Sequence, residues 1–251
     1  MFAQTVITFA RSDDYFFGVL HSSVHELWAL RMGTQLEDRP RYTPTTCFET
    51  FALPWCPGSE PAGTDCGEPG RVAPARGDAG GKVERGADGA TGRADTARLA
   101  WERISGAARE LNELRERWLN PPEWIGPLAK TVDALDGFSD VPDEARALIR
   151  QSAIMAAAAK DVRLKKRTLT NLYNQRPEWL KAAHEKLDRA VLGAYALVDA
   201  EGGWQEDWAL VWRDSGAGQA LENAHPLALR RGEVDQQVLA NLLRLNRQRQ
   251  G

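Results

Sequence analysis

The sequence predicts a mainly α-helical protein with a short N-terminal α/β fragment, a disordered insertion rich in Gly, Pro and Ala, and a C-terminal helical bundle. Three observations indicate this fold class. Apolar residues recur at helical spacing after residue 96, a β-branched segment lies near the N-terminus, and large apolar residues are almost missing between residues 57 and 95. We therefore divide the chain into residues 1–56, 57–95 and 96–251.

The N-terminal fragment begins with a predicted strand over Thr5–Ala10, which is β-branched and apolar. Asp13 and Asp14 are N-cap candidates for a helix whose apolar residues recur over Phe17–Met32. Gly33 follows the last of these residues and is a residue type that commonly ends helices. One continuous helix is therefore expected up to Gly33.

A polar turn is expected next at Glu37–Arg41, followed by an extended segment over Tyr42–Phe51 that alternates Thr with aromatic or small residues. Residues 57–95 then hold nearly half of the glycines, together with Pro, Ala and charges. Such a segment cannot bury enough apolar surface to offset its ordering entropy, so we expect a disordered insertion.

Four helices are expected after the insertion. The first covers Thr96–Leu119 and ends before a Pro pair, the second runs from Pro142 to about Lys160, and the third opens at Pro177. The second helix has Leu148, Ile149, Ala153 and Ala156 on one face, and the third has Leu180, Ala183, Leu187, Val191, Ala194 and Val198 on its inner face. The last helix is marked by Val234, Val238, Leu242 and Leu245, and it ends in an Arg-rich tail.

The bulk composition excludes several classes of protein. About 43% of residues are apolar and 27% are charged, as in ordinary soluble domains, and the formal net charge is −3. Any nucleic-acid contact must therefore come from a local cluster of Lys and Arg. The three cysteines are odd in number and form no CxxC pair, which argues against a disulfide framework or a zinc ribbon. No apolar run approaches the roughly 18 residues of a membrane span. We expect a cytoplasmic protein that does not contact a membrane.

Two short motifs have a chemical interpretation and a simpler structural one. Asn120-Pro121-Pro122-Glu123 is similar to the Asn-Pro-Pro-aromatic loop that grips a flipped adenine, but it has Glu instead of the aromatic and follows a helix rather than a strand. A helix stop explains the Pro pair more simply. His21 and His25 have the four-residue spacing of metal ligands, yet no third ligand is near, so partly buried helix histidines are the better interpretation. We expect no catalytic, cofactor or metal site in this chain.

Candidate DNA contacts form two sets. The first is the basic run that ends with Lys165, Lys166 and Arg167, followed by the polar residue Thr168. Such residues suit phosphate and sugar contacts, but they equally fit a solvated helix end. The second set comprises Arg39, Arg41 and Tyr42 on the polar turn, where Arg can reach guanine in the major groove. An ordinary charged loop explains this second set as well.

Several strings resemble one known family. FGVLHS (Phe17–Ser22), HELWAL (His25–Leu30) and RYTPTTCFETFALPW (Arg41–Trp55) are similar, in this order, to the end of the target-recognition region of MmeI-like (type IIG/IIL) restriction–modification DNA adenine methyltransferases. RERWLNPPE at Arg115–Glu123, the string at Leu164–Tyr195 and VLANLLRLNRQR at Val238–Arg249 resemble the C-terminal helical region of the same proteins.

The resemblance implies that residues 1–56 are the end of a recognition domain and that the later helices support it on DNA. In the intact family enzyme, S-adenosylmethionine is the cofactor for methylation of adenine N6 at a specific sequence. The nuclease, the cofactor loop and the catalytic motif precede the matched strings in that family, and none can be matched here.

Two hypotheses about function follow. In the first, the chain contributes target recognition and DNA clamping, binds double-stranded DNA and works with a separately encoded methyltransferase catalytic chain, without activity of its own. In the alternative, it is a helical interaction module or a remnant with no DNA role, as the net negative charge suggests.

Overall fold

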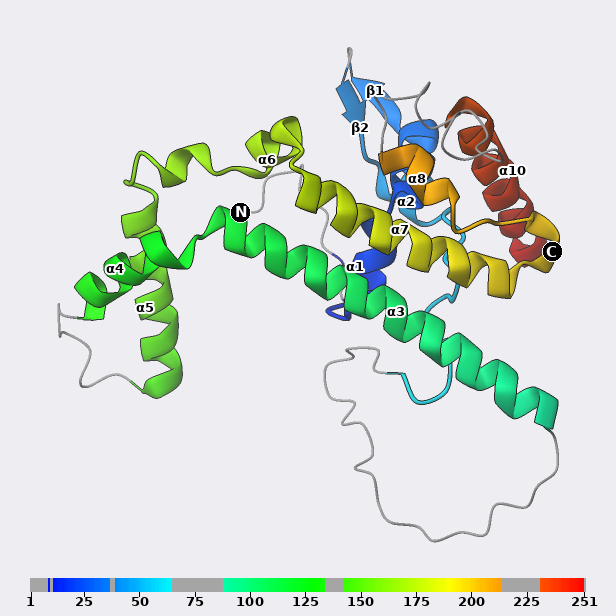
Figure 1. The fold of residues 1–251 in the computed structure, drawn as a ribbon, viewed down its shortest axis with the longest axis horizontal. Coiled ribbons are helices and arrows are strands. Elements are labelled where there is room, and N and C mark those ends of the chain that lie inside the picture. Colours follow the sequence, from blue (N-terminus) through cyan, green and yellow to red (C-terminus); the bar gives the residue numbers. More distant parts are fainter. Residues whose placement is uncertain are drawn as a thin grey trace, which may run out of the picture. The chain divides into compact units, whose positions relative to one another are not determined.

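A computed structural model describes residue 9 and residues 11–36, 39–64, 88–133, 142–213 and 231–250. In this part the protein is mostly helical, so the predicted fold class is confirmed (Figure 1). The helices are α1 (Asp14–Leu20), α2 (Ser23–Met32), α3 (Asp88–Leu119), α4 (Pro122–Asp133), α5 (Asp143–Ala158), α6 (Leu169–Gln175), α7 (Glu178–Val198), α8 (Trp208–Arg213) and α10 (Arg231–Gln250). Strands β1 (Thr34–Leu36) and β2 (Arg39–Arg41) form a two-stranded sheet, and single turns η1, η2 and η3 cover Pro44–Phe48, Leu164–Lys166 and Ala200–Gly202.

The chain forms two compact units. The first comprises Met1–Arg109 together with Ala182–Gly251, and the second comprises Glu110–Lys181. The long helices α3 and α7 each contribute residues to both units. These units do not coincide with the three ranges predicted from composition, because composition marks changes along the chain whereas a compact unit joins segments that are distant in sequence.

The first unit is built around a close approach of three helices at Gly18 in α1. A Cβ atom added at this position would lie 2.9 Å from Ala108 Cβ, 3.0 Å from Ile104 Cγ2 and 3.2 Å from Leu187 Cδ1. These separations are shorter than ordinary van der Waals contact, so only glycine lets α1 approach α3 and α7 this closely.

Two buried tyrosines hold the extended segment that follows η1. The Tyr15 hydroxyl accepts a hydrogen bond from Trp55 N at 3.0 Å, and the Tyr195 hydroxyl donates to Ala52 O at 2.7 Å. The Tyr15 ring stacks on Trp101 of α3 with a centroid separation of 3.6 Å. Burial of these aromatic rings stabilises the unit, and their hydroxyls satisfy backbone groups that would otherwise be buried without partners.

Helices α7 and α10 follow their predicted amphipathic patterns. Val234, Val238, Leu242 and Leu245 of α10 are buried, as are Leu180, Ala183, Leu187, Val191 and Ala194 of α7. The Arg-rich end of α10 is bonded within the first unit, since Arg249 Nη1 donates to Leu53 O at 2.6 Å. Arg244 Nη2 lies 2.7 Å from Asp199 Oδ1.

The single helix predicted up to Gly33 is wrong, because the chain forms α1 and α2 with a break at His21 and Ser22. The Ser22 side chain caps α2 by accepting a hydrogen bond from His25 N. Ser23 N and Ser23 Oγ each donate to the buried carboxylate of Asp188 at 2.7 Å. The Ser22 cap and Asp188 of α7 together stabilise a new helix start at Ser23. Their effect outweighs the apolar periodicity that predicted one continuous helix. The predicted cap by Asp13 and the helix end at Gly33 are both confirmed.

The extended segment predicted over Tyr42–Phe51 is also wrong, because η1 occupies Pro44–Phe48 and a turn follows at Glu49 and Thr50. Glu49 N donates to Pro44 O at 3.0 Å and Cys47 N donates to Thr43 O at 2.8 Å. Threonine hydroxyls can donate hydrogen bonds to nearby backbone carbonyls, as the Thr50 hydroxyl does to Thr46 O. Such local bonds favour a turn over an extended strand. The Glu37–Arg41 turn is in part the strand β2.

The second unit contains α4, α5, η2 and α6. The apolar face predicted for α5 is not the face that packs, since Leu148 is 71% exposed and Ile149 is 37% exposed, whereas Ile154 and Ala158 are buried. The helix has alanine on several sides, so periodicity could not select the face that packs. Helix α4 was not predicted, although Pro122 at its first position is a typical helix opening.

Two other predictions, the N-terminal strand and the insertion, concern residues that the structure mostly does not describe. Apart from Phe9, the strand predicted over Thr5–Ala10 is not among them, and neither are residues 65–87 of the predicted insertion. Residues 88–95 of that insertion belong to α3. Among the helices that the structure describes, none combines the length and apolar content needed to cross a membrane.

Two glycine substitutions test the close approach of the three helices. We expect Gly18→Ala to lower the free energy of unfolding by about 1–3 kcal/mol, because the added methyl group overpacks the core. Gly106→Ala is the matched control, since Gly106 lies on the exposed side of α3 and a Cβ there meets no atom within 4 Å. This control should raise stability by about 0.5–1 kcal/mol. Chemical denaturation measures both, and equal effects of the two variants would contradict the packing argument.

Candidate nucleic-acid interface

The seven candidate DNA contacts fall in different compact units. Arg39, Arg41 and Tyr42 belong to the first unit, and Lys165, Lys166, Arg167 and Thr168 belong to the second. The structure groups each set with its own neighbours.

The first set lies on and next to the β1–β2 hairpin. Antiparallel pairing places Thr34 opposite Arg41, Gln35 opposite Pro40 and Leu36 opposite Arg39. Arg41 is exposed. A two-stranded ribbon of this type has the width to enter the major groove of B-DNA, and the guanidinium of an arginine can bond the O6 and N7 atoms of guanine.

Tyr42 anchors the end of the hairpin to α2. Its hydroxyl lies 3.0 Å from His25 Nε2, and the side chain is half-buried. Burial, with a smaller effect of Cys47, raises the pKa of Tyr42 to about 12. The hydroxyl thus already has a partner within the protein, which leaves Arg41 as the more accessible candidate for a base contact.

His25 is held as a neutral, buried histidine. It is 4% exposed, and its ring packs edge-on against Phe51 at 4.4 Å between centroids. Burial is the main cause that lowers the pKa of His25 to about 4, and the nearby His21 contributes. His21 Nδ1 lies 2.9 Å from Phe17 O. In the described part of the chain no three His, Cys, Asp or Glu side chains are grouped so that they could hold a metal ion.

The second set lies in a strongly basic segment. From Lys160 to Arg176 the sequence has six Lys or Arg residues and one acidic residue, Asp161. The turn η2 is anchored by the buried Leu164, and Lys165 and Lys166 beside it are exposed. Within the described residues, neither lysine has an ion-pair partner. Their charge is therefore available to a ligand.

The Arg167 side chain, unlike those of Lys165 and Lys166, is held by neighbouring groups of the protein. Its guanidinium carbon lies 4.9 Å from the ring centroid of Trp118 and 4.7 Å from that of Trp124. Arg163 lies 4.9 Å from Trp124, so cations and indole rings alternate in the order Trp118, Arg167, Trp124, Arg163. We call these four side chains the Trp–Arg stack. Each such cation–π contact contributes about 0.5–2 kcal/mol, depending on its exposure to solvent.

Arg167 also caps the C-terminal end of α3. Its Nη1 atom donates to Trp118 O at 2.8 Å. The last four carbonyls of a helix have no partner within the helix, and a cation at this end also complements the helix dipole. A hydrogen bond from a charged donor contributes about 1.5–3 kcal/mol. Arg167 therefore joins the basic segment to the corner between α3 and α4.

Thr168 has a structural role as well. Its hydroxyl oxygen accepts a hydrogen bond from Asn171 N at 3.2 Å and so caps α6. The Asn171 side chain in turn donates to Lys166 O at 2.7 Å. The side chain of Arg163 is paired with Asp161, at 2.7 Å between Nη2 and Oδ2, and its hydrogen bonds lower the pKa of Asp161 to about 2. Of the predicted basic set, Lys165 and Lys166 remain the exposed, unpaired cations.

Sequence reasoning did not connect Trp118 or Trp124 with the basic run. A signal was present, because one tryptophan stands on each side of the Pro121–Pro122 pair and an Arg-rich run follows in the same helical region. As the simpler interpretation of the motif predicted, α3 ends before the Pro pair, at Leu119. Asn120 and Pro121 form the turn to α4, which begins at Pro122. Asn120 Nδ2 donates to Glu116 Oε2 at 3.1 Å in this turn.

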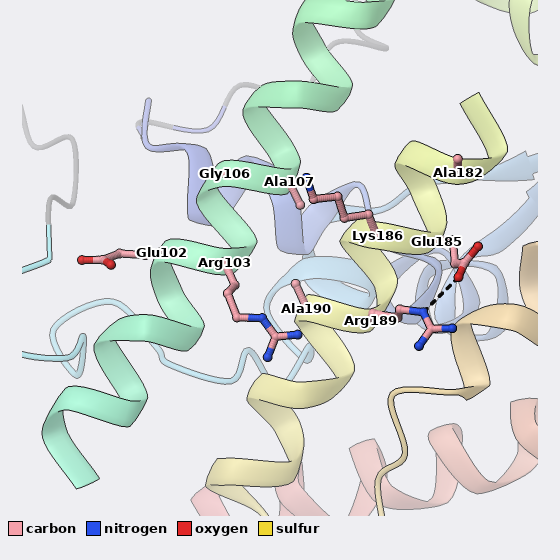
Figure 2. Close-up of a pocket in the computed structure, with 9 residues that line it drawn as sticks. All are labelled: Glu102, Arg103, Gly106, Ala107, Ala182, Glu185, Lys186, Arg189 and Ala190. Atoms are coloured by element: carbon pink, nitrogen blue, oxygen red, sulfur yellow. Dashed lines mark hydrogen bonds and ion pairs between the residues drawn. The ribbon is translucent and has the colours of Figure 1, made fainter. Parts of the chain in front are cut away.

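A groove of about 500 Å³ lies between α3 and α7 in the first unit. Figure 2 shows Arg103 and Lys186 extending from opposite helices into the space between them, and Ala107 and Ala190 also line this space. Arg103 pairs with Glu206 at 3.3 Å. The rest of the lining combines charged side chains, Glu102, Glu185 and Arg189, with the small residues Gly106 and Ala182.

No protein-family model, curated protein or solved structure matches this chain. The candidate interface therefore rests on the residues and geometry described above and on the resemblance stated from the sequence.

The buried, neutral state of His25 predicts a pH-dependent loss of stability. Its pKa is about 4 in the folded protein and about 6.5 in the unfolded chain, so the unfolded state binds more protons between these values. The difference in unfolding free energy between the wild type and His25→Gln should fall as the pH is lowered from 6.5 to 4, by about 3 kcal/mol. Denaturation at a series of pH values measures this difference.

Asp188 makes the free energy of unfolding change with pH in the opposite direction over the same range. This contribution is present in both proteins and cancels in the difference between wild type and His25→Gln. Burial raises the pKa of Asp188 to about 7, so its contribution to stability decreases as the pH rises from 3.8 to 7. A difference between wild type and His25→Gln that does not change with pH would contradict the neutral, buried state of His25.

Proposed function

We propose that this chain supplies target recognition and DNA clamping to a site-specific adenine-N6 DNA methyltransferase of a restriction–modification system. The observation that supports this most directly is the pair of exposed lysines, Lys165 and Lys166, on a turn whose neighbouring side chains are fixed within the second unit. The order of the strings that resemble the MmeI-like family supports the same function.

The two candidate sets suit different tasks. Lysine is a compact point charge that binds phosphate oxygens without sequence preference, so the Lys165–Lys166 pair suits the DNA backbone. Arg41 stands on a narrow two-stranded ribbon, which suits a base edge in the major groove. In this proposal the second unit contributes affinity and the first unit contributes sequence preference.

The methyl transfer itself is assigned to a separately encoded catalytic chain. That partner would hold S-adenosylmethionine and the adenine-binding motif, as the intact family enzyme does. In this proposal the chain described here positions that partner on its DNA site. The test is adenine methylation of duplex DNA by each chain alone and by the mixture, with DNA binding measured over a series of salt concentrations. Methylation only in the mixture supports the proposal, and no DNA binding in any sample contradicts it.

One observation favours the alternative of a helical interaction module. Leu148 and Met155 of α5 are 71% and 48% exposed, and they lie seven residues apart and thus on the same side of the helix. Exposed apolar side chains on one side of a helix are typical of protein–protein contacts. Retention of a protein partner by a variant that no longer binds DNA would favour this alternative.

Removing the lysine pair tests the backbone contact. We expect Lys165→Ala with Lys166→Ala to weaken DNA binding to a similar extent on all sequences, and to reduce the slope of log affinity against log salt by about 2. Anisotropy titrations of labelled duplexes at several salt concentrations measure both quantities. Lys130→Ala, which removes an exposed lysine from α4, is the control and should leave the slope nearly unchanged. An unaltered slope in the double variant would show that the lysines are merely solvated.

Substitution of Arg41 tests base recognition. Arg41→Ala should change sequence preference, with a loss of about 1–3 kcal/mol at the base that the arginine contacts and a smaller loss elsewhere. Selection from a randomised duplex library by wild type and variant measures this preference. A uniform loss on every sequence would contradict a base-reading role and would indicate a backbone contact.

A further inference from the structure

The residues around the lysine pair hold its backbone from both sides. Lys165 N donates to Asp161 O at 3.0 Å, and Arg167 N donates to Leu164 O at 2.8 Å to close η2. The next side chain, Arg167, is bonded to the carbonyl of Trp118 and lies over two indole rings. The direction in which the two lysines leave the turn therefore depends on where Arg167 is fixed.

We infer that Arg167 is a positioning residue for Lys165 and Lys166, acting through the Trp–Arg stack, and that it is not itself a DNA contact. This inference rests on the proposed DNA-binding function. A guanidinium that grips a phosphate presents its N–H edges to the ligand. In Arg167 one nitrogen is directed to Trp118 O, and both indole rings lie within 5 Å of the guanidinium carbon.

The physical effect is preorganisation of the binding turn. A flexible turn with two long side chains loses conformational freedom when it binds, and this loss reduces affinity. The Trp–Arg stack has already restricted the turn in the free protein, so the lysines meet the phosphates with less additional ordering. Arginine is suited to this task and lysine is not, because only the planar guanidinium can stack on an indole ring while it donates to a carbonyl in its own plane.

The test separates positioning from charge. Arg167→Lys keeps the positive charge but removes the planar stacking group, so we expect DNA affinity to fall about five- to tenfold while the salt slope stays at the wild-type value. Arg117→Lys is the matched control, because Arg117 is an exposed arginine in the last turn of α3, close in sequence to Trp118. This control should change affinity less than about twofold.

A second pair of variants keeps all charges. Trp124→Leu removes the aromatic face and should lower affinity about as much as Arg167→Lys, whereas Trp124→Phe retains a face and should restore most of it. Near-ultraviolet circular dichroism of each free variant, recorded well below its unfolding temperature, reports whether the indole rings have lost their fixed surroundings. Arg167→Lys and Trp124→Leu should both change this spectrum, and Arg117→Lys should not.

The outcomes are distinguishable. If the wild type binds DNA and Arg167→Lys binds with the affinity of Arg117→Lys, the inference is overturned and the proposed function stands. A salt slope that falls by about 1 in Arg167→Gln, which removes the charge, also overturns it, because the lost counterion release would indicate that Arg167 contacts phosphate. If the wild type does not bind DNA at any salt concentration, the proposed function fails and the inference fails with it.

Discussion

The close approach of α1, α3 and α7 at Gly18 is the constraint on which the first unit depends. The three helices come from residues near 18, 104 and 187, so their crossing brings together segments far apart in the sequence. Because α1 is short, its buried aromatic residues reach α3 only if its backbone lies close. The stack of Tyr15 on Trp101 and the bonds from Tyr15 to the segment around Trp55 both require this position.

The same crossing brings α7 into position to stabilise other parts of the unit through polar side chains. Asp188 accepts two hydrogen bonds from the start of α2, and Tyr195 bonds Ala52 in the extended segment. Buried polar groups must be satisfied, so each of these contacts fixes one backbone segment in a specific place. The hairpin that carries Arg41 follows α2 directly, and Tyr42 connects its end to His25. The location of this candidate contact thus follows from the hydrogen bonds by which Asp188 of α7 fixes the start of α2.

The second unit uses the same residue types for two purposes. Arg167 and Lys166 are adjacent and both cationic, yet one is half-buried between indole rings and the other is exposed. The Arg167 guanidinium, which is hydrogen-bonded and lies against indole rings, stabilises the fold. The exposed Lys166 ammonium instead adds to the positive surface potential that attracts a phosphate backbone. In the proposed division of tasks, the affinity that the second unit contributes depends on both kinds of residue, although only its exposed lysines contact the DNA.

The sequence by itself determined the helical class of this protein and the inner faces of α7 and α10, because strongly periodic apolar residues leave one face to bury. It also located the basic segment and the helix stop at the Pro pair, which are local features of composition. Only the tertiary structure decided the break between α1 and α2, since the partner that stabilises it, Asp188, lies 165 residues away. The packed face of the Ala-rich α5 and the role of Arg167 were likewise decided by neighbours, because several faces of α5 were equally apolar and a basic run does not reveal which cation meets an indole ring.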